Sequence, residues 1–197
     1  QTEPLDYLNC IDANTNRKKE INSVVNEMIR ASKYGSHDGS DFEKSLKPFI
    51  ELFRETANVE IIAGSGDTDL LCVMEKGNNS LYKMNVDAKT RKAGLDQINA
   101  ARLQKHLNKN GAKFCVVVAP RFTLGVSDDI NGSNIVTIRA ADIGNYCYNE
   151  CIKSKDGFAD FNSIYEHIVN NLGTDITEFV RKLTIERYGI QLSESNY

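Results

Sequence analysis

The spacing of apolar residues predicts an alternation of helices and strands along the 197-residue chain. Apolar side chains recur at helical intervals over residues 14–33, 41–56, 95–110, 156–171 and 174–188, which predicts five helices. Asn14 or Thr15 is the expected cap of the first helix, and Gly111 is the expected end of the third. Short apolar or β-branched runs predict strands over residues 59–63, 70–75, 81–88, 114–119 and 135–138.

The order of these elements favours an α/β fold. The turn KGNNS joins the strands at 70–75 and 81–88 into an antiparallel hairpin. A connection of helix length separates 81–88 from 114–119, which predicts that these two strands are parallel neighbours. Because residues 114–119 read FCVVVA, that strand should be buried on both faces. We therefore expect a mixed central β-sheet of about five strands flanked by helices.

The predicted hairpin carries the most informative polar residues of the chain. Asp69 begins one of its strands, and Asp87-Ala88-Lys89 ends the other. Antiparallel pairing places the start of one strand beside the end of its partner. Side chains alternate along a strand, so Asp87 and Lys89 point to the same face. Two carboxylates and one ammonium group should therefore meet at one edge of the sheet.

Such a group has the composition that phosphodiester hydrolysis requires. Mg²⁺ prefers oxygen ligands and commonly takes one or two protein carboxylates. Asp69, Asp87 and the backbone carbonyl of Ala88 are the expected metal ligands, with Mn²⁺ as a substitute ion. Lys89 would orient the attacking water or stabilise charge on the phosphorus. Asp67 is the alternative first ligand; we prefer Asp69 because it leads directly into the apolar strand.

Positive charge is concentrated around this hairpin and the helix after it. The formal net charge of −3 argues against a stand-alone nucleic-acid binder. Residues 81–121 nevertheless hold nine basic and two acidic residues, a net of +7, so the rest of the chain carries −10. Arg91 and Lys92 in the following loop, and Arg102 and Lys105 on the outer face of the third helix, are the expected DNA contacts. An ordinary solvated helix face is the alternative.

The arrangement Asp69 … Asp87-Ala88-Lys89 resembles the motif of the PD-(D/E)xK nuclease superfamily, although Thr68 stands where that motif has proline. The resemblance covers about residues 41–119 and is strongest to the cleavage domains of type IIS restriction endonucleases, the FokI-like group. It implies a further acidic ligand on the helix before the hairpin, which holds Glu43, Glu51 and Glu55. Glu43 is the candidate, and a solvated surface glutamate is the alternative. It also implies a polar residue at the start of the third helix, where Gln97 stands.

The resemblance implies a restriction-endonuclease-like fold and a Mg²⁺-dependent endonuclease that hydrolyses DNA, as the cleavage module of a type II or IIS restriction enzyme. It implies one nuclease domain over 1–197, with an N-terminal helical extension at 1–40, a catalytic core at 41–139 and C-terminal helices at 140–197. Each site would cut one strand, so double-stranded DNA would require a homodimer or a transient dimer, with a separate recognition domain or subunit. The alternatives are a Holliday-junction resolvase or DNA-repair nuclease, and a non-catalytic DNA-binding domain of the same fold.

Other chemistry finds little support in the sequence. The five cysteines are odd in number, which indicates reduced thiols, and no apolar run or signal-like start predicts a membrane segment, so we expect a cytoplasmic chain. Cys147 and Cys151 lack a second ligand pair, which favours helix packing over a zinc site. No histidine metal motif and no glycine-rich phosphate loop occurs. Because the chain begins at Gln1, we expect a fragment or a processed part of a larger protein.

Overall fold

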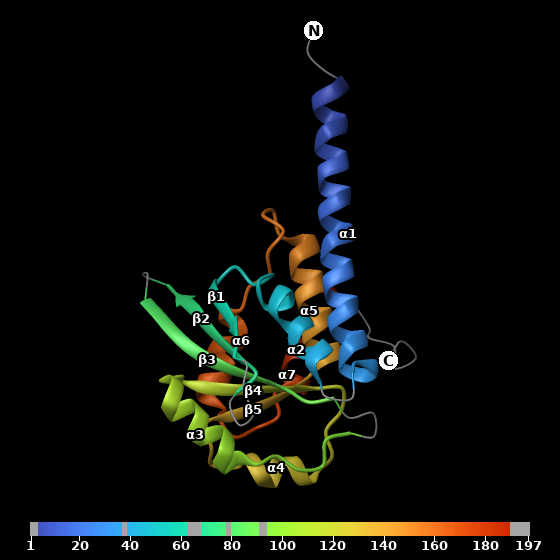
Figure 1. The fold of residues 1–197 in the computed structure, drawn as a ribbon. Coiled ribbons are helices and arrows are strands. Elements are labelled where there is room, and N and C mark those ends of the chain that lie inside the picture. Colours follow the sequence, from blue (N-terminus) through green and yellow to red (C-terminus); the bar gives the residue numbers. More distant parts are fainter. Residues whose placement is uncertain (1–3, 37–38, 63–67, 78–79, 91–93, 190–197) are drawn as a thin grey trace.

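A mixed five-stranded sheet forms the centre of the molecule, with helices on both of its faces (Figure 1). The computed structural model describes residues 4–36, 39–62, 68–77, 80–90 and 94–189, with side chains from residue 15 onward. The α/β class and the mixed sheet expected from the sequence are confirmed. The strands, side by side in chain order, are β1 (Thr56–Ile61), β2 (Leu70–Lys76), β3 (Ser80–Ala88), β4 (Phe114–Ala119) and β5 (Ile135–Arg139). The helices are α1 (Pro4–Tyr34), α2 (Ser40–Ile50), α3 (Ala100–Asn110), α4 (Gly125–Ile130), α5 (Ala140–Lys153), α6 (Asn162–Asn170) and α7 (Thr177–Tyr188).

The pairing of the strands sets which of their ends meet. β1, β2 and β3 pair antiparallel, whereas β3, β4 and β5 run parallel to one another. The β2–β3 hairpin and the parallel neighbours β3 and β4 are therefore as predicted. Because β2 runs opposite to β3, the amino end of β2 lies at the same edge of the sheet as the carboxyl ends of β3, β4 and β5.

β4 is the buried centre of the sheet, and every one of its residues is buried. Its alternate side chains join two separate apolar clusters. One cluster packs against α1, α2, α5, α6 and α7 and includes Phe114, Val116 and Val118. The other packs against α3 and α4 on the opposite face and includes Cys115, Val117 and Ala119. The continuous apolar run is thus explained by burial on both faces, as predicted.

The second predicted helix is too long, because α2 ends at Ile50 rather than at Thr56. The backbone of residues 52–54 instead pairs with Ala159, through two hydrogen bonds of 2.9 Å. This partner is far away in the sequence, so the apolar periodicity does not reveal it. Glu51 and Glu55 therefore lie beyond the helix that was expected to carry them.

The third predicted helix starts too early, because α3 begins at Ala100 rather than at Leu95. Leu95 forms two backbone hydrogen bonds of 2.9 Å with residues 121 and 123, so it continues the pairing of β3 with β4 beyond the sheet. Asn99 caps α3, since its side chain accepts a hydrogen bond from the Arg102 amide at 2.9 Å. Gly111 ends the helix at a φ of 62°, as predicted.

Other helix boundaries also differ from the predictions. α1 already begins at Pro4, so neither Asn14 nor Thr15 is its cap. α6 and α7 begin at Asn162 and Thr177, later than predicted. α4 was not predicted, because so short a helix shows little periodicity, and α5 lies in the region assigned to C-terminal helices without predicted bounds. Among the described residues, no helix is both long enough and apolar enough to cross a membrane.

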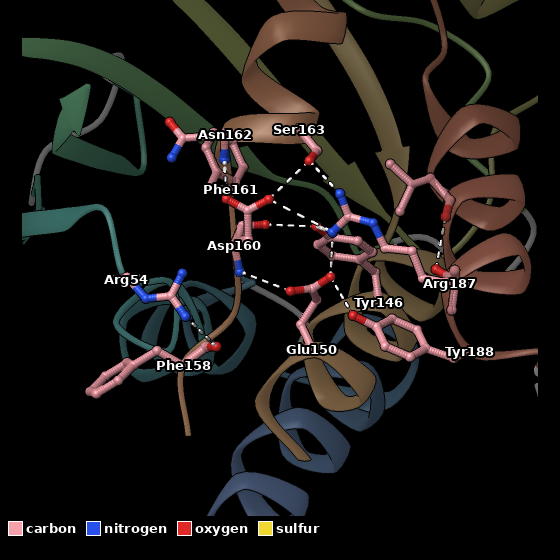
Figure 2. A network of polar contacts seen from close by, with 12 residues as sticks. Arg54, Tyr146, Glu150, Phe158, Asp160, Phe161, Asn162, Ser163, Arg187 and Tyr188 are labelled. Atoms are coloured by element: carbon pink, nitrogen blue, oxygen red, sulfur yellow. Dashed lines mark hydrogen bonds and ion pairs between the residues drawn. The ribbon is translucent and has the colours of Figure 1, made fainter. Parts of the chain in front are cut away.

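A network of polar contacts fastens the last turn of α7 to the other C-terminal helices (Figure 2). Glu150 of α5 accepts hydrogen bonds from the Arg187 guanidinium group and the Tyr188 hydroxyl group. Arg187 also donates to Ser163 Oγ at 2.6 Å and lies 3.7 Å from the Asp160 carboxylate. Because the two carboxylates already have donors within the protein, we assign this network to stability rather than to chemistry.

Gly144 lets α1 and α5 pack closely together. A Cβ atom on this residue would lie 2.8 Å from Ile29 Cδ1 and 3.3 Å from Met28 Cε. We predict that Gly144→Val lowers the free energy of unfolding by about 1–3 kcal/mol, because the added side chain must displace α1. Urea denaturation followed by circular dichroism measures the change. Lys153→Val, at an exposed position of the same helix, is the matched control. Equal midpoints for the two variants would contradict the close packing.

Candidate active site

The β2–β3 hairpin brings Asp69 and Asp87 together at the sheet edge. The register sets Leu70 opposite Val86, so one position further out Asp69 lies opposite Asp87. Oδ2 of Asp69 accepts a hydrogen bond from the Ala88 amide at 2.6 Å, which ties the carboxylate to the neighbouring strand. Directly opposed residues of antiparallel strands share one face of the sheet. The two carboxylates therefore meet as the spacing in the sequence predicts.

Thr68 reinforces this junction from the position where the related motif has proline. Its side chain is buried, and its hydroxyl group donates a hydrogen bond to the Val86 carbonyl at 3.2 Å. The contact crosses the same strand pair as the bond between Asp69 and Ala88. A hydrogen-bonding side chain thus holds the entry to β2 in place, where a proline would do so through its restricted backbone.

The Asp87 side chain is fully buried, with 0% of its surface exposed. No uncharged group among the described residues donates a hydrogen bond to either carboxylate oxygen. Each oxygen instead faces a cation: Lys89 Nζ forms an ion pair with Oδ2, and Arg102 Nη2 lies 3.9 Å from Oδ1. Burying a carboxylate is costly for the fold even when cations pair with it, and here both cations belong to partly exposed side chains. Such a group is expected where function, rather than stability, selects the residue.

The pair of carboxylates perturbs the ionisation of Asp69. Burial, and then the negative charge of Asp87, raises the pKa of Asp69 to about 7. Lys89 and the hydrogen bond from the Ala88 amide oppose this rise, and the charge of Glu43 adds to it. Two acidic groups that repel each other in a partly buried place are a setting in which a bound cation is favoured.

Glu43 lies near this pair, whereas Gln97 does not occupy the predicted place. Glu43 is in the first turn of α2, and a Cβ atom on Gly39 would lie 3.9 Å from its Oε1 and 3.7 Å from Thr90 Oγ1. The start of α2 therefore adjoins the segment that follows β3. Gln97 is exposed in the non-helical segment before α3. Site roles for Glu43 and Gln97 stay predictions.

The predicted DNA contacts are only partly within the described residues. Arg102 and Lys105 are exposed on α3, as the helical pattern predicts. Arg91 and Lys92 lie outside the described residues, as does Asp67. The preference for Asp69 over Asp67 therefore rests on what Asp69 itself does, which is to oppose Asp87 and bind the Ala88 amide.

Buried polar residues that the sequence analysis did not single out extend inward from the site. Asn85 is fully buried two positions before Asp87, and its side-chain oxygen accepts a hydrogen bond from Asn110 Nδ2 at 3.3 Å. His106 is buried on the inner side of α3. The signal available for Asn85 was the alternation of polar residues 85, 87 and 89 along an otherwise apolar strand, which places them on one face.

The candidate metal ligands at the carboxyl end of β3 are few, and all of them are oxygen atoms. Among the described residues, no group of three or more His, Cys, Asp or Glu side chains is arranged to hold a metal ion. Cys147 and Cys151 are buried free thiols with their Sγ atoms 4.0 Å apart. Asp69, Asp87 and the Ala88 carbonyl form a smaller set. Such a set suits Mg²⁺, which keeps several waters and takes one or two protein carboxylates.

Comparisons with known proteins point to restriction enzymes. No model of a protein family matches the chain. The type II restriction enzyme HgaI of Avibacterium volantium is 34% identical over 150 residues, which are 75% of this chain and 29% of that protein. The structure of restriction endonuclease FokI matches with a TM-score of 0.57 at 15% identity, over 76% of this chain and 30% of FokI. The structure of FokI bound to DNA matches with a TM-score of 0.56 at 16% identity, over 82% and 33% of the two chains.

The chain spans only about a third, or less, of the length of each of these proteins. The similarity to HgaI extends over most of this chain and shows a relationship in sequence. The similarity to FokI, at much lower identity, shows a shared fold. In sequence this chain is therefore related to a segment of a type II restriction enzyme, and in fold it is similar to a segment of FokI.

Proposed function

We propose that this chain is the DNA-cleavage module of a type II restriction enzyme, and that it hydrolyses phosphodiester bonds with the help of a divalent cation. The observation that carries the proposal is the meeting of Asp69, Asp87 and Lys89 at one edge of the sheet. The relationship to HgaI and the fold shared with FokI support the same activity. Because FokI has been solved bound to DNA, we propose double-stranded DNA as the substrate.

The residues at this edge fit a Mg²⁺ ion. Both oxygens of Asp87 are buried, and the groups beside them are the cationic side chains of Lys89 and Arg102, so positive charge is favoured at this carboxylate. We assign Asp69 and the Ala88 carbonyl as the further oxygen ligands. Mn²⁺ prefers the same ligand types and would substitute. When bound, such an ion neutralises phosphate charge and lowers the pKa of a bound water.

Lys89 is the residue that we assign to the reacting groups. Its Nζ pairs with Asp87 and also donates to the Ala88 carbonyl at 3.3 Å, so two neighbours hold it in place. Its side chain is 31% exposed, so the ammonium group reaches both the buried carboxylate and the surface. From there it would hold the attacking water by a hydrogen bond, or offset the charge that develops on the phosphate.

The basic residues around the site would bind the DNA backbone. We propose Arg102 and Lys105 of α3, together with Arg91 and Lys92, which follow Lys89 in the sequence, as phosphate contacts. One set of reacting groups cuts one strand, so we propose that two copies act on a duplex as a homodimer or a transient dimer. HgaI and FokI are much longer than this chain, which supports a separate recognition domain or subunit.

Cleavage of supercoiled plasmid with Mg²⁺ tests the proposed function. We expect the wild type to nick and linearise the plasmid, and EDTA to stop the reaction. Lys89→Ala should cut about tenfold more slowly, or slower still, because a charge-stabilising group is lost. Lys83→Ala, at an exposed position near the other end of β3, is the matched control and should cut at the wild-type rate. Equal rates for the wild type and both variants would refute the assignment of Lys89.

A further inference from the structure

Arg102 reaches back from α3 to the end of β3. Its Nη2 atom lies 3.9 Å from Oδ1 of Asp87, while Lys89 pairs with Oδ2 of the same carboxylate. The Arg102 side chain is 45% exposed, whereas that of Asp87 is 0% exposed. One buried carboxylate therefore has a different cation beside each of its oxygens, and one of the two cations remains open to solvent.

The first turn of a helix is an unfavourable place for a cation. The backbone gives the amino end of α3 a partial positive charge, which repels the guanidinium group of Arg102. No acidic residue in the first turn of α3 offsets this repulsion. The negative charge of Asp87, on the neighbouring strand, lies 3.9 Å from the guanidinium group and opposes this repulsion.

The two cations are not held equally. Lys89 is bound to Asp87 and also donates to the Ala88 carbonyl at 3.3 Å. Arg102 approaches Asp87 at a longer distance, and more of its side chain is exposed. Arg102 is thus the cation that leaves Asp87 more readily. Its planar guanidinium group can bind a phosphate through two hydrogen bonds, which an ammonium group cannot do in the same way.

We propose that Arg102 couples divalent-cation binding to DNA binding at this site, an inference that rests on the proposed function. Without DNA, Arg102 competes with a divalent cation for Oδ1 of Asp87. When DNA binds, Arg102 forms hydrogen bonds with a phosphate instead, and Oδ1 of Asp87 becomes available to the divalent cation. Cation and DNA then strengthen each other's binding, because each favours the arrangement in which Arg102 has left Asp87. Arg102 acts here as a positioning residue, through Asp87.

Calorimetric titration of Ca²⁺, which takes the same oxygen ligands, measures this coupling with and without a short DNA duplex. A gel of the titrated sample verifies that the duplex stays intact. The wild type should bind Ca²⁺ about tenfold more tightly with the duplex. Arg102→Gln should bind Ca²⁺ about fivefold more tightly than the wild type without DNA, because a competing positive charge is gone. The duplex should then raise the Ca²⁺ affinity of Arg102→Gln only slightly.

Two variants separate this role from a general effect of charge. Arg102→Lys retains a cation beside Asp87 and should keep part of the coupling. Lys109→Gln removes the same charge from an exposed position of the same helix and should titrate like the wild type. The coupling is refuted if Arg102→Gln binds Ca²⁺ no more tightly than Lys109→Gln does. It is also refuted if the duplex raises the Ca²⁺ affinity of Arg102→Gln as much as that of the wild type. Plasmid cleavage by the wild type would persist in either case, so the proposed function would stand. A wild type that neither cleaves plasmid nor binds a divalent cation would refute both proposals.

Discussion

Asp87→Asn is expected to slow DNA cleavage about a thousandfold, since several kcal/mol of stabilisation by a bound cation would be lost from the transition state. The same substitution should not destabilise the fold. Asp87 is buried beside the partly exposed cations Lys89 and Arg102, and its charge repels that of Asp69. An amide of the same shape avoids the cost of burying that charge. Lys89 loses its partner, but it is 31% exposed and can turn to water.

Asp142→Asn is the matched control for this prediction. The Asp142 side chain is also 0% exposed, but its two oxygens accept hydrogen bonds from Arg139 Nε at 2.7 Å and Arg181 Nε at 3.0 Å. Its substitution should lower the free energy of unfolding by about 1–3 kcal/mol. Cleavage should stay near the wild-type rate at temperatures where the variant is folded. Single-turnover cleavage and thermal unfolding measure the two effects. If Asp87→Asn lowered the melting temperature as much as Asp142→Asn does, Asp87 would be a structural residue.

Four of the five strands could be predicted to within one residue at each end, whereas β1 begins at Thr56 instead of at residue 59. β4 begins and ends at the predicted residues, because Lys113 and Pro120 bound an apolar run that suits a strand buried on both faces. The helix ends depend on partners that are distant in the sequence. α2 stops where residues 52–54 meet Ala159, and Leu95 pairs with the segment after β4 instead of entering α3. Apolar periodicity carries no information about such partners.

One part of the candidate site could likewise be predicted from the sequence, and another part could not. The opposition of Asp69 and Asp87 follows from the register of one hairpin, which the alternation of apolar residues already specifies. The approach of Arg102 to Asp87 joins two elements, and it depends on where the helix starts. A helix that began at Leu95 would put Arg102 in its middle; the observed start at Ala100 puts it in the first turn. The sequence therefore indicated that Arg102 is exposed, but not that it contacts the buried carboxylate.

Divalent-cation binding to the DNA-free protein is expected to weaken as the pH falls below 7. Burial, and then the charge of Asp87, raises the pKa of Asp69 to about 7, and a carboxylate must be ionised to bind a cation. Each pH unit below 7 should lower the affinity about tenfold, so roughly a hundredfold is lost between pH 8 and pH 5. Calorimetric titration of Mn²⁺ across this range measures the effect. An affinity that stays constant down to pH 5 would show that Asp69 has an ordinary pKa or does not bind the ion.

The same ionisation makes the stability of the cation-free protein depend on pH. The pKa of Asp69 in the folded protein is about 7, above its usual 3.8, so the folded state binds the proton more tightly than the unfolded chain does. The resulting stabilisation is fully present below the usual pKa and is lost as the pH rises through 7. Asp69→Asn removes it, whereas titrating groups outside this site act on both proteins alike. The free energy of unfolding of the wild type, minus that of Asp69→Asn, should therefore fall between pH 4 and pH 8 in urea titrations with EDTA. A difference that is the same at every pH would mean that neither burial nor Asp87 perturbs Asp69, and that the two carboxylates are too weakly coupled to share a cation.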